Sequence, residues 1–243
     1  MAKPGFIELP GAEPIPILYE NRSVLAVDKP RGWMLVPFSW QTTNRSLQAA
    51  IVSSIAAGDF WARSRGLKFL RFVHRLDADT TGILLFAKSQ GAVEALGDLF
   101  ESRRMEKTYL AVTATVPKQT EWICRLKLSP SPGRIGRMKA DAQHGKEAET
   151  RFRMLQRLDA RALIAAVPLT GRTHQIRVHL AESGCPVIGD ELYGRRDPRL
   201  GFGLRAVRLG YTDPFTRRKV EIRAPVEEFC QEYGFEIPST SIL

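Results

Sequence analysis

The stretch His74-Arg75-Leu76-Asp77-Ala78-Asp79-Thr80-Thr81-Gly82 is polar and lies between two apolar runs. These runs, residues 69–73 and 83–87, have the composition of buried strands. Local propensity explains the stretch as a capped turn, because Asp and Thr bond turn backbone and Gly supplies a positive φ. A second polar segment, residues 169–180, also interrupts an apolar pattern. Two such segments in one chain favour a shared functional task.

Composition indicates a globular protein with a polyanionic partner. The chain has 243 residues, and its 44% hydrophobic content is ample for a buried core. It carries 36 Lys and Arg against 26 Asp and Glu, a formal net charge of +10. Nucleic acid is therefore the favoured partner, ahead of an anionic membrane surface.

The sequence shows neither an apolar run long enough to span a membrane nor the apolar core of a signal peptide at its start. Three widely separated cysteines, an odd number, suit a reducing compartment, and none has zinc-ligand spacing. We therefore expect a cytoplasmic protein that has no membrane partner.

Periodicity and turn residues predict an α+β chain of many mostly antiparallel strands. The predicted strands cover residues 17–20, 24–28, 33–36, 69–73, 83–87, 107–114, 122–126, 147–155, 161–168, 204–209 and 219–223. Helices are predicted from a Ser46 cap to Ala57, from a Ser89 cap to about residue 101, over 173–182 and from Pro225. Residues 129–146 predict a basic loop or hairpin. We expect an extended, proline-rich lead-in over 1–16 and a single domain over 17–243, with two lobes around a cleft as an open alternative.

Within the first polar segment, Asp77 is the best candidate nucleophile or base. It follows bulky Leu76, and partial burial would tie its charge to a cation. Asp79 is the rival, to which we assign turn support through bonds to backbone N–H groups. His74 could be a general base, but a histidine before an arginine on a strand is more often a hydrogen-bonded structural residue.

The second segment places Arg172, His174, Gln175, Arg177 and His179 close together. It could be a solvated basic helix face. Alternatively, Arg177 projects inward and pairs with a carboxylate, for which its planar fork is suited. The two histidines are five apart and do not share a helix face, which disfavours a metal site.

These segments together resemble the RluA-type pseudouridine synthases. The resemblance runs in family order over about residues 17–229, through the motifs at 17–20, 27–32, 74–82, 107–109, 171–179 and 189–194. It implies an α+β catalytic domain built on a long, curved, mostly antiparallel sheet flanked by helices, with the active site in a basic cleft. Two positions depart from the family: Met34-Leu35-Val36-Pro37 lacks the frequent His before Pro, and Leu204-Arg205-Ala206 stands where Leu-His-Ala is common.

The resemblance also implies roles for individual residues. Asp77 would be the catalytic aspartate, Arg177 its ion-pair partner and Tyr109 the tyrosine packed against the target base, although spacing alone favours Tyr109 as a core residue. Arg75 would fill the space left by the flipped nucleotide. The expected RNA contacts are Arg75, His74, Arg172, His174, Arg103, Arg104, Arg134, Arg137 and Lys139.

The implied activity is the isomerisation of uridine to pseudouridine in ribosomal or transfer RNA, without a metal or organic cofactor. We expect a monomer, with no room before residue 17 for the small N-terminal RNA-binding module that many relatives carry. Asp77 would start glycosidic cleavage by adding to the base or the sugar, or by taking a sugar proton. A catalytically silent RNA-binding or ribosome-assembly protein is the main alternative, and a metal-dependent small-molecule enzyme is disfavoured.

Overall fold

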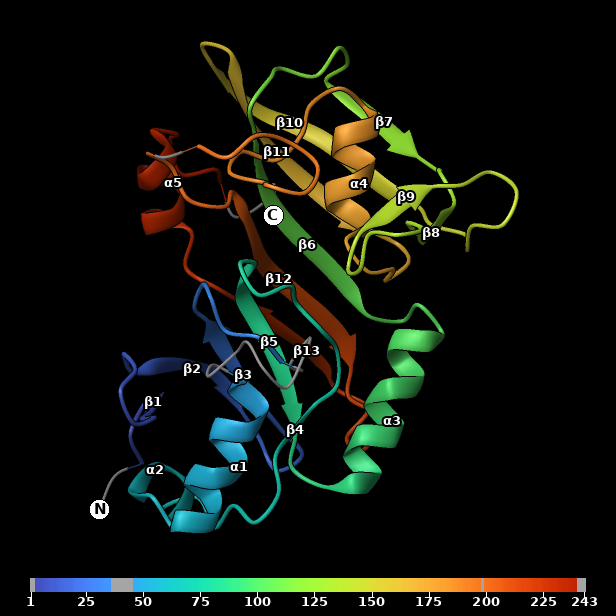
Figure 1. Ribbon diagram of the computed structural model, residues 1–243. Coiled ribbons are helices and arrows are strands. Elements are labelled where there is room, and N and C mark those ends of the chain that lie inside the picture. Colours follow the sequence, from blue (N-terminus) through green and yellow to red (C-terminus); the bar gives the residue numbers. More distant parts are fainter. Residues whose placement is uncertain (1–2, 36–45, 198, 240–243) are drawn as a thin grey trace. The chain divides into compact units, whose positions relative to one another are not determined.

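The computed structural model describes residues 3–35, 46–197 and 199–239, and its chain folds into two compact units (Figure 1). The first unit comprises residues 1–105 with 210–224, and the second comprises residues 106–209 with 225–243. Strand β12 (Leu204–Thr212) contributes its first six residues to the second unit and its last three to the first.

The first unit contains helices and a sheet in which the pairs from β1 to β5 are antiparallel. Its strands run in the order β1 (Phe6–Ile7), β2 (Ile15–Glu20), β3 (Val24–Lys29), β5 (Thr81–Ala87) and the end of β12. The two-residue β4 (Arg71–Phe72) pairs with β5, and β13 (Lys219–Arg223) pairs with β12. β3 and β5 are buried almost throughout and form the centre of this unit.

Helices α1 (Leu47–Ala57) and α3 (Gln90–Glu101) begin where the sequence predicts. The Ser46 and Ser89 hydroxyls accept hydrogen bonds from the backbone N–H three residues on, as N-caps do. Gly58 ends α1 at φ 72°, a conformation that favours glycine. The short α2 (Phe60–Arg63) buries Trp61, whose indole N–H donates to the Ser54 hydroxyl at 2.8 Å.

The second unit continues from β12 through β6 (Glu106–Thr113), β11 (Arg161–Pro168), β10 (Thr150–Leu158) and β7 (Glu121–Cys124). Each pair from β6 to β7 is antiparallel. Helix α4 (Gln175–Glu182) packs Ile176 and Leu180 into one core cluster and Val178 into a smaller one. Helix α5 (Glu227–Tyr233) packs into a third cluster. β8 (Leu128–Pro130) and β9 (Met138–Ala140) form a separate hairpin in the predicted basic region.

The α+β class and the mostly antiparallel strands are confirmed, but two details were wrong. The lead-in over 1–16 is not separate from the fold, because β1 pairs with β2 and the side chains of Ile7 and Ile15 are fully buried. The strand predicted over 33–36 is absent from its described part, where Met34 forms one isolated bridge with Ser46. Its last residue, Val36, and the neighbouring Pro37 lie outside the described residues.

Candidate active site

The polar turn after β4 is held by a buried lysine, Lys29. Lys29 is fully buried at the end of β3, and its ammonium donates to the carbonyls of Pro30, Ala78 and Thr80 at 3.0, 2.7 and 2.9 Å. The Gly32 N–H also donates to the Ala78 carbonyl, at 3.0 Å. The residue directly after Asp77 is therefore fixed by two independent hydrogen bonds.

Burial lowers the pKa of Lys29 to about 8, and the negative charges of Asp79 and Asp77 partly oppose this shift. The charges of the two aspartates thus act on the same buried ammonium. Asp77 is half-buried, and Leu76 before it is buried, as the sequence predicts. Asp79 is exposed, and among the described residues no hydrogen bond of its carboxylate to backbone is seen, so its assigned bonds to backbone N–H groups were wrong.

His74 makes structural contacts in this unit, and its expected contact with RNA stays a prediction. Its Nε2 accepts a hydrogen bond from the Leu85 N–H at 3.1 Å, and its ring stacks on Phe100 with 4.9 Å between centroids. Nε2 is therefore unprotonated, which agrees with the structural interpretation. Arg75 is exposed on the same turn, as a residue that contacts RNA must be.

Arg103 and Arg104 are both exposed at the end of α3. The Arg103 and Arg104 N–H groups donate to the carbonyls of Phe100 and Leu99 at 3.2 and 2.9 Å, the pattern of a Schellman motif. These bonds fix the backbone of both arginines and leave their side chains in solvent.

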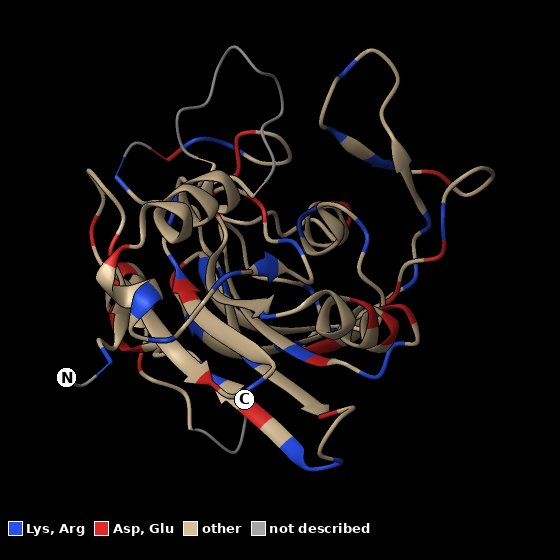
Figure 2. Cartoon of the chain, turned by 90° about the horizontal axis from the view of Figure 1, so that it is seen from below, with Lys and Arg blue, Asp and Glu red and all other residues tan. Residues whose placement is uncertain are grey.

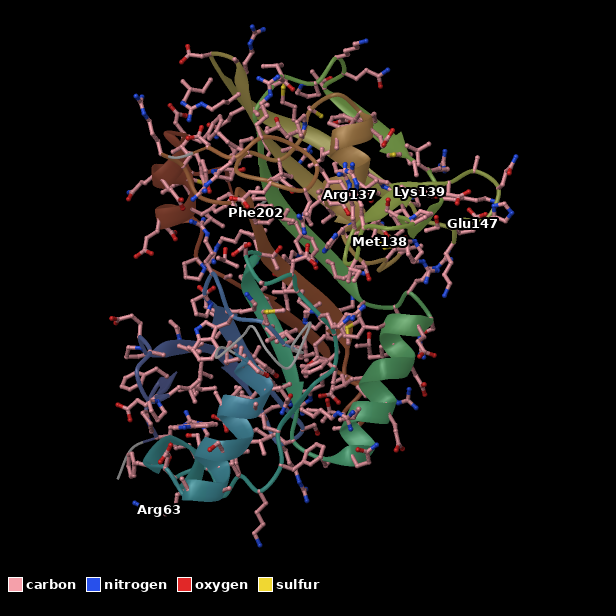
Figure 3. All side chains as sticks on the ribbon, in the orientation of Figure 1. Arg63, Arg137, Met138, Lys139, Glu147 and Phe202 are labelled. Carbon is pink, nitrogen blue, oxygen red and sulfur yellow. The ribbon has the colours of Figure 1, made fainter. Side chains whose placement is uncertain are left out.

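In the second unit, Arg177 is buried on α4 and forms a bidentate pair with Asp190, at 2.8 and 2.9 Å. Its guanidinium also lies 5.1 Å from the ring centroids of Tyr193 and Phe202, the second of which is labelled in Figure 3. Asp190 in turn accepts from the N–H groups of Leu192 and Tyr193. The prediction that Arg177 points inward to a carboxylate is confirmed for Asp190, and its pairing with Asp77 stays a prediction.

Helix α4 is buried on all sides from Gln175 to Leu180, so the solvated basic face considered above is wrong. The Gln175 amide donates to the Glu149 carbonyl and the Thr150 hydroxyl, both at 2.9 Å. Thr150 Oγ1 also lies 2.9 Å from His179 Nδ1, and His179 Nε2 lies 3.0 Å from the Leu126 carbonyl. This network satisfies the polar groups that the sequence pattern placed in water.

Tyr109 is half-buried on β6 and packs against the core cluster under α4. Lys107 lies two residues earlier on β6, where side chains of a strand share a face. Burial lowers the pKa of Lys107 to about 8, and its ammonium makes one long hydrogen bond of 3.4 Å to the Thr170 carbonyl. Sequence reasoning quoted Lys107 in a motif without giving it a role.

The remaining candidate RNA contacts of the second unit lie near α4 and on the β8–β9 hairpin. Arg172 donates to the Glu147 carbonyl at 3.0 Å, and His174 Nδ1 lies 2.9 Å from the Tyr193 hydroxyl. Arg137 lies over the Tyr193 ring, and Lys139 is 3.5 Å from Asp141. Arg134 is exposed in the hairpin loop. Figure 2 shows the Lys and Arg positions of the chain in blue.

The part of the chain that the structure describes contains no group of three or more His, Cys, Asp or Glu that could hold a metal ion. None of its helices has the length and apolar character needed to cross a membrane. The fold and the site residues together define an α+β protein in which charged side chains are held by buried polar networks.

The chain belongs to the RNA pseudouridylate synthase family, whose sequence model matches residues 23–182. This confirms the resemblance seen in the sequence motifs. Among curated proteins, the chain is 34% identical over 231 residues to the ribosomal large subunit pseudouridine synthase C of Escherichia coli (strain K12). The match covers 87% of this chain and 66% of that protein, so the chain spans slightly less than two thirds of its relative's length. The protein of the same name from Vibrio cholerae is 32% identical over 227 residues, covering 89% of this chain and 67% of the relative.

Solved structures give the same fold. Human RNA pseudouridylate synthase domain containing 1 superposes with a TM-score of 0.75 at 25% identity, over 96% of this chain and 94% of that one. Human RNA pseudouridylate synthase domain containing 4 has a TM-score of 0.72 at 21% identity, over 92% and 94% of the two chains. The pseudouridine synthase fold predicted from the sequence is thus confirmed.

Proposed function

We propose that this protein is an RNA pseudouridine synthase that converts uridine to pseudouridine in large-subunit ribosomal RNA. The observation that carries the proposal is the fixed turn around Asp77, where Lys29 and Gly32 both bind the Ala78 carbonyl. Family membership and the names of the relatives support this substrate class, with transfer RNA as the second candidate.

The reaction breaks the bond between ribose C1′ and N1 of uracil and joins C1′ to C5 of the rotated ring. N1 gains a proton and C5 loses one, so the reaction needs neither an oxidant nor a reductant. Because C5 must reach C1′, the base has to leave its stack and enter an enclosed site. We assign the start of cleavage to Asp77, by addition to base or sugar or by removal of a sugar proton.

Other side chains support this role for Asp77. The family resemblance assigns to Arg177 the role of keeping the Asp77 carboxylate ionised. In the structure two hydrogen bonds to Asp190 fix the orientation of the buried Arg177 guanidinium. Tyr109 packs against the target base, and Arg75 fills the space that the base leaves. The exposed Arg103, Arg104 and Arg134 bind phosphates and position the strand.

The decisive experiment compares wild type with Asp77→Asn on a transcribed large-subunit ribosomal RNA labelled with tritium at uridine C5. Wild type should release tritium, and Asp77→Asn should reduce the rate by at least about a thousandfold, because an amide cannot replace an ionised carboxylate as nucleophile or base. Asp79→Asn is the matched control, since this exposed carboxylate lies two residues away and should be replaceable with most of the activity kept.

Full activity in Asp77→Asn would overturn the assigned mechanism. If wild type binds ribosomal and transfer RNA but releases no tritium from either, the protein is a silent RNA-binding or ribosome-assembly factor. Mapping pseudouridine in cells with and without the gene then identifies the modified position, and an unchanged map also favours the silent factor.

The proposal treats the two compact units, with strand β1 included, as one catalytic domain acting as a monomer in the cytoplasm. Strand β12 supports a single domain, because it belongs to both compact units. Three unpaired, buried cysteines support a reducing compartment. Sedimentation of the purified protein tests the monomer directly.

A further inference from the structure

The loop of the β8–β9 hairpin presents an isoleucine to solvent. The side chain of Ile135 is 90% exposed, whereas the next most exposed large apolar side chain in the described part of the chain, that of Phe215, is 53% exposed. Single exposed apolar residues are common, but an almost fully exposed isoleucine at a loop tip is not explained by packing.

Hydrogen bonds give this loop a defined shape. The Arg134 N–H donates to the Ser131 carbonyl at 3.3 Å, and Gly133, the third residue of that turn, has φ 68°. The Arg137 N–H donates to the Arg134 carbonyl at 3.1 Å, and Gly136 has φ 77°. Both are type II turns, and the Ser131 N–H closes the loop on the Arg137 carbonyl at 2.8 Å. Ile135 is the second residue of the second turn and, being β-branched, has a stiff side chain.

The base of the hairpin is anchored to the rest of the second unit. The Met138 N–H donates to the Tyr193 hydroxyl at 2.7 Å, and the Arg137 guanidinium lies 5.4 Å from the Tyr193 ring centroid. Figure 3 labels Arg137 and Met138 close to α4. On the other side, Asp141 accepts from the His144 N–H and the Ser129 hydroxyl, both at 2.9 Å. These bonds lower the pKa of Asp141 to about 2. The loop tip is therefore presented from a fixed base.

The surroundings of Ile135 are cationic. Arg134 precedes it with an exposed side chain, and Arg137 and Lys139 follow it on the strand side of the loop. The Lys139 ammonium lies 3.5 Å from the Asp141 carboxylate. An apolar tip flanked by cations fits a partner that offers phosphates beside apolar, stackable surface. Nucleic acid offers both, since wedging side chains enter between stacked bases while arginines hold the backbone.

We propose that Ile135 is an apolar wedge that enters between stacked bases of a structured RNA held by Arg134, Arg137 and Lys139. The proposal rests on the proposed function, because it assumes that the partner is RNA. Separating a base step next to the target lowers the work of extracting the uridine from its stack. The wedge thus acts on the RNA at the base-extraction step, whereas Asp77 acts on the extracted nucleotide.

A stem-loop RNA carrying 2-aminopurine at successive stem positions tests the wedge directly. Unstacking raises the fluorescence of this base, so wild type should raise it at one or two adjacent positions. Ile135→Ala should abolish the rise while RNA affinity falls less than about threefold, since the three cations supply most of the affinity. Ile135→Met, which restores apolar length, should recover the signal, and Ile135→Ser should not. Ile237→Ala is the matched control, because Ile237 is also an exposed isoleucine, at 52%, and lies outside the hairpin.

Turnover on the tritiated ribosomal RNA is the second measurement. Ile135→Ala should lower kcat by about tenfold with an unchanged melting temperature. An unchanged fluorescence rise in Ile135→Ala overturns the wedge and leaves the proposed function intact. A fluorescence rise in wild type without tritium release overturns the proposed function and leaves the wedge. If wild type does not bind RNA, the proposal is also overturned.

Discussion

Lys29 shows how a single residue in this fold acts far from its place in the sequence. It opens the segment Lys29-Pro30-Arg31-Gly32, in which Pro and Gly favour a turn. In the structure its ammonium binds the carbonyls of Ala78 and Thr80, on the turn that contains Asp77. Such a contact depends on pairing between β3 and β5, which no local pattern encodes. The inward direction of Arg177 was predictable, because arginine in an apolar segment needs an anion, but its partner Asp190 was not.

We predict that Lys29→Met destabilises the protein and lowers activity. Methionine fills a similar volume but cannot donate to the three carbonyls, and hydrogen bonds from a charged donor are the strong ones. The free energy of unfolding should fall by on the order of 3 kcal/mol. Urea denaturation followed by circular dichroism measures this change, and tritium release measures the activity.

Lys68→Met is the control for Lys29→Met, because Lys68 is an exposed lysine of the same unit. It should change the free energy of unfolding by less than about 0.5 kcal/mol. If Lys29→Met is equally mild, the ammonium does not hold the turn.

At the scale of elements, the ends of the helices were predictable and the environment of α4 was not. Ser46, Ser89 and Gly58 are local signals, and each acts at the position where the sequence places it. Helix α4 carries Gln175 and His179 on what looks like a polar face, yet their partners come from β10 and from Leu126. Sequence periodicity reports polarity, and it cannot report whether a distant strand satisfies that polarity.

Helix α3 ends on an arginine where glycine is favoured. Arg103 has φ 59°, while α1 and α5 end on Gly58 and Gly234 at φ 72° and 77°. Arg103→Gly should therefore raise the free energy of unfolding by about 0.5–1 kcal/mol. If Arg103 binds a phosphate as proposed, Arg103→Gly should also weaken RNA binding and reduce its salt dependence. Thermal melts and binding at several salt concentrations measure the two effects.

Arg103→Lys separates the two effects of Arg103→Gly. Lysine keeps the charge and the unfavourable φ, so both the stability and the salt dependence should stay close to wild type. A weaker salt dependence in Arg103→Lys would argue that the guanidinium itself, rather than its charge, binds RNA.

Buried His179 predicts a loss of stability in acid. Burial lowers the pKa of His179, and the hydrogen bond to the Leu126 carbonyl opposes the shift in part. The unfolded chain therefore takes up the proton first, so the free energy of unfolding should fall as pH drops below about 6.5. His179→Gln removes this titration, so the decrease in melting temperature from pH 7 to pH 5 should be smaller than in wild type. The side chain of His144 is 82% exposed, so His144→Gln should show the same decrease in melting temperature at pH 5 as wild type.

At the scale of the whole molecule, motif order predicted the fold class and the family, and both are confirmed, whereas the polyanionic partner expected from composition stays a prediction. The sequence left the division into two lobes as an open alternative. The division is hard to read from the sequence, because the segment 210–224 returns to the first unit after more than a hundred residues of the second. Hydrophobic periodicity assigns strands but does not say which unit a strand joins. Strand β12 belongs to both units. The chain also passes from one unit to the other at residues 105–106 and 224–225.

This sharing predicts that the two units unfold together. All three cysteines lie in the second unit, where Cys185 and Cys230 are fully buried and Cys124 is nearly so. Burial raises the pKa of Cys185 to about 11, so thiol labelling of the native protein at pH 8 should be slow and should report the opening of the second unit. Lys29→Met acts in the first unit, yet it should lower the urea midpoint of thiol labelling and the circular dichroism midpoint equally. Unfolding of β12 in the first unit removes structure from the same strand in the second. A labelling midpoint that stays at the wild-type value in Lys29→Met would show that the units unfold independently.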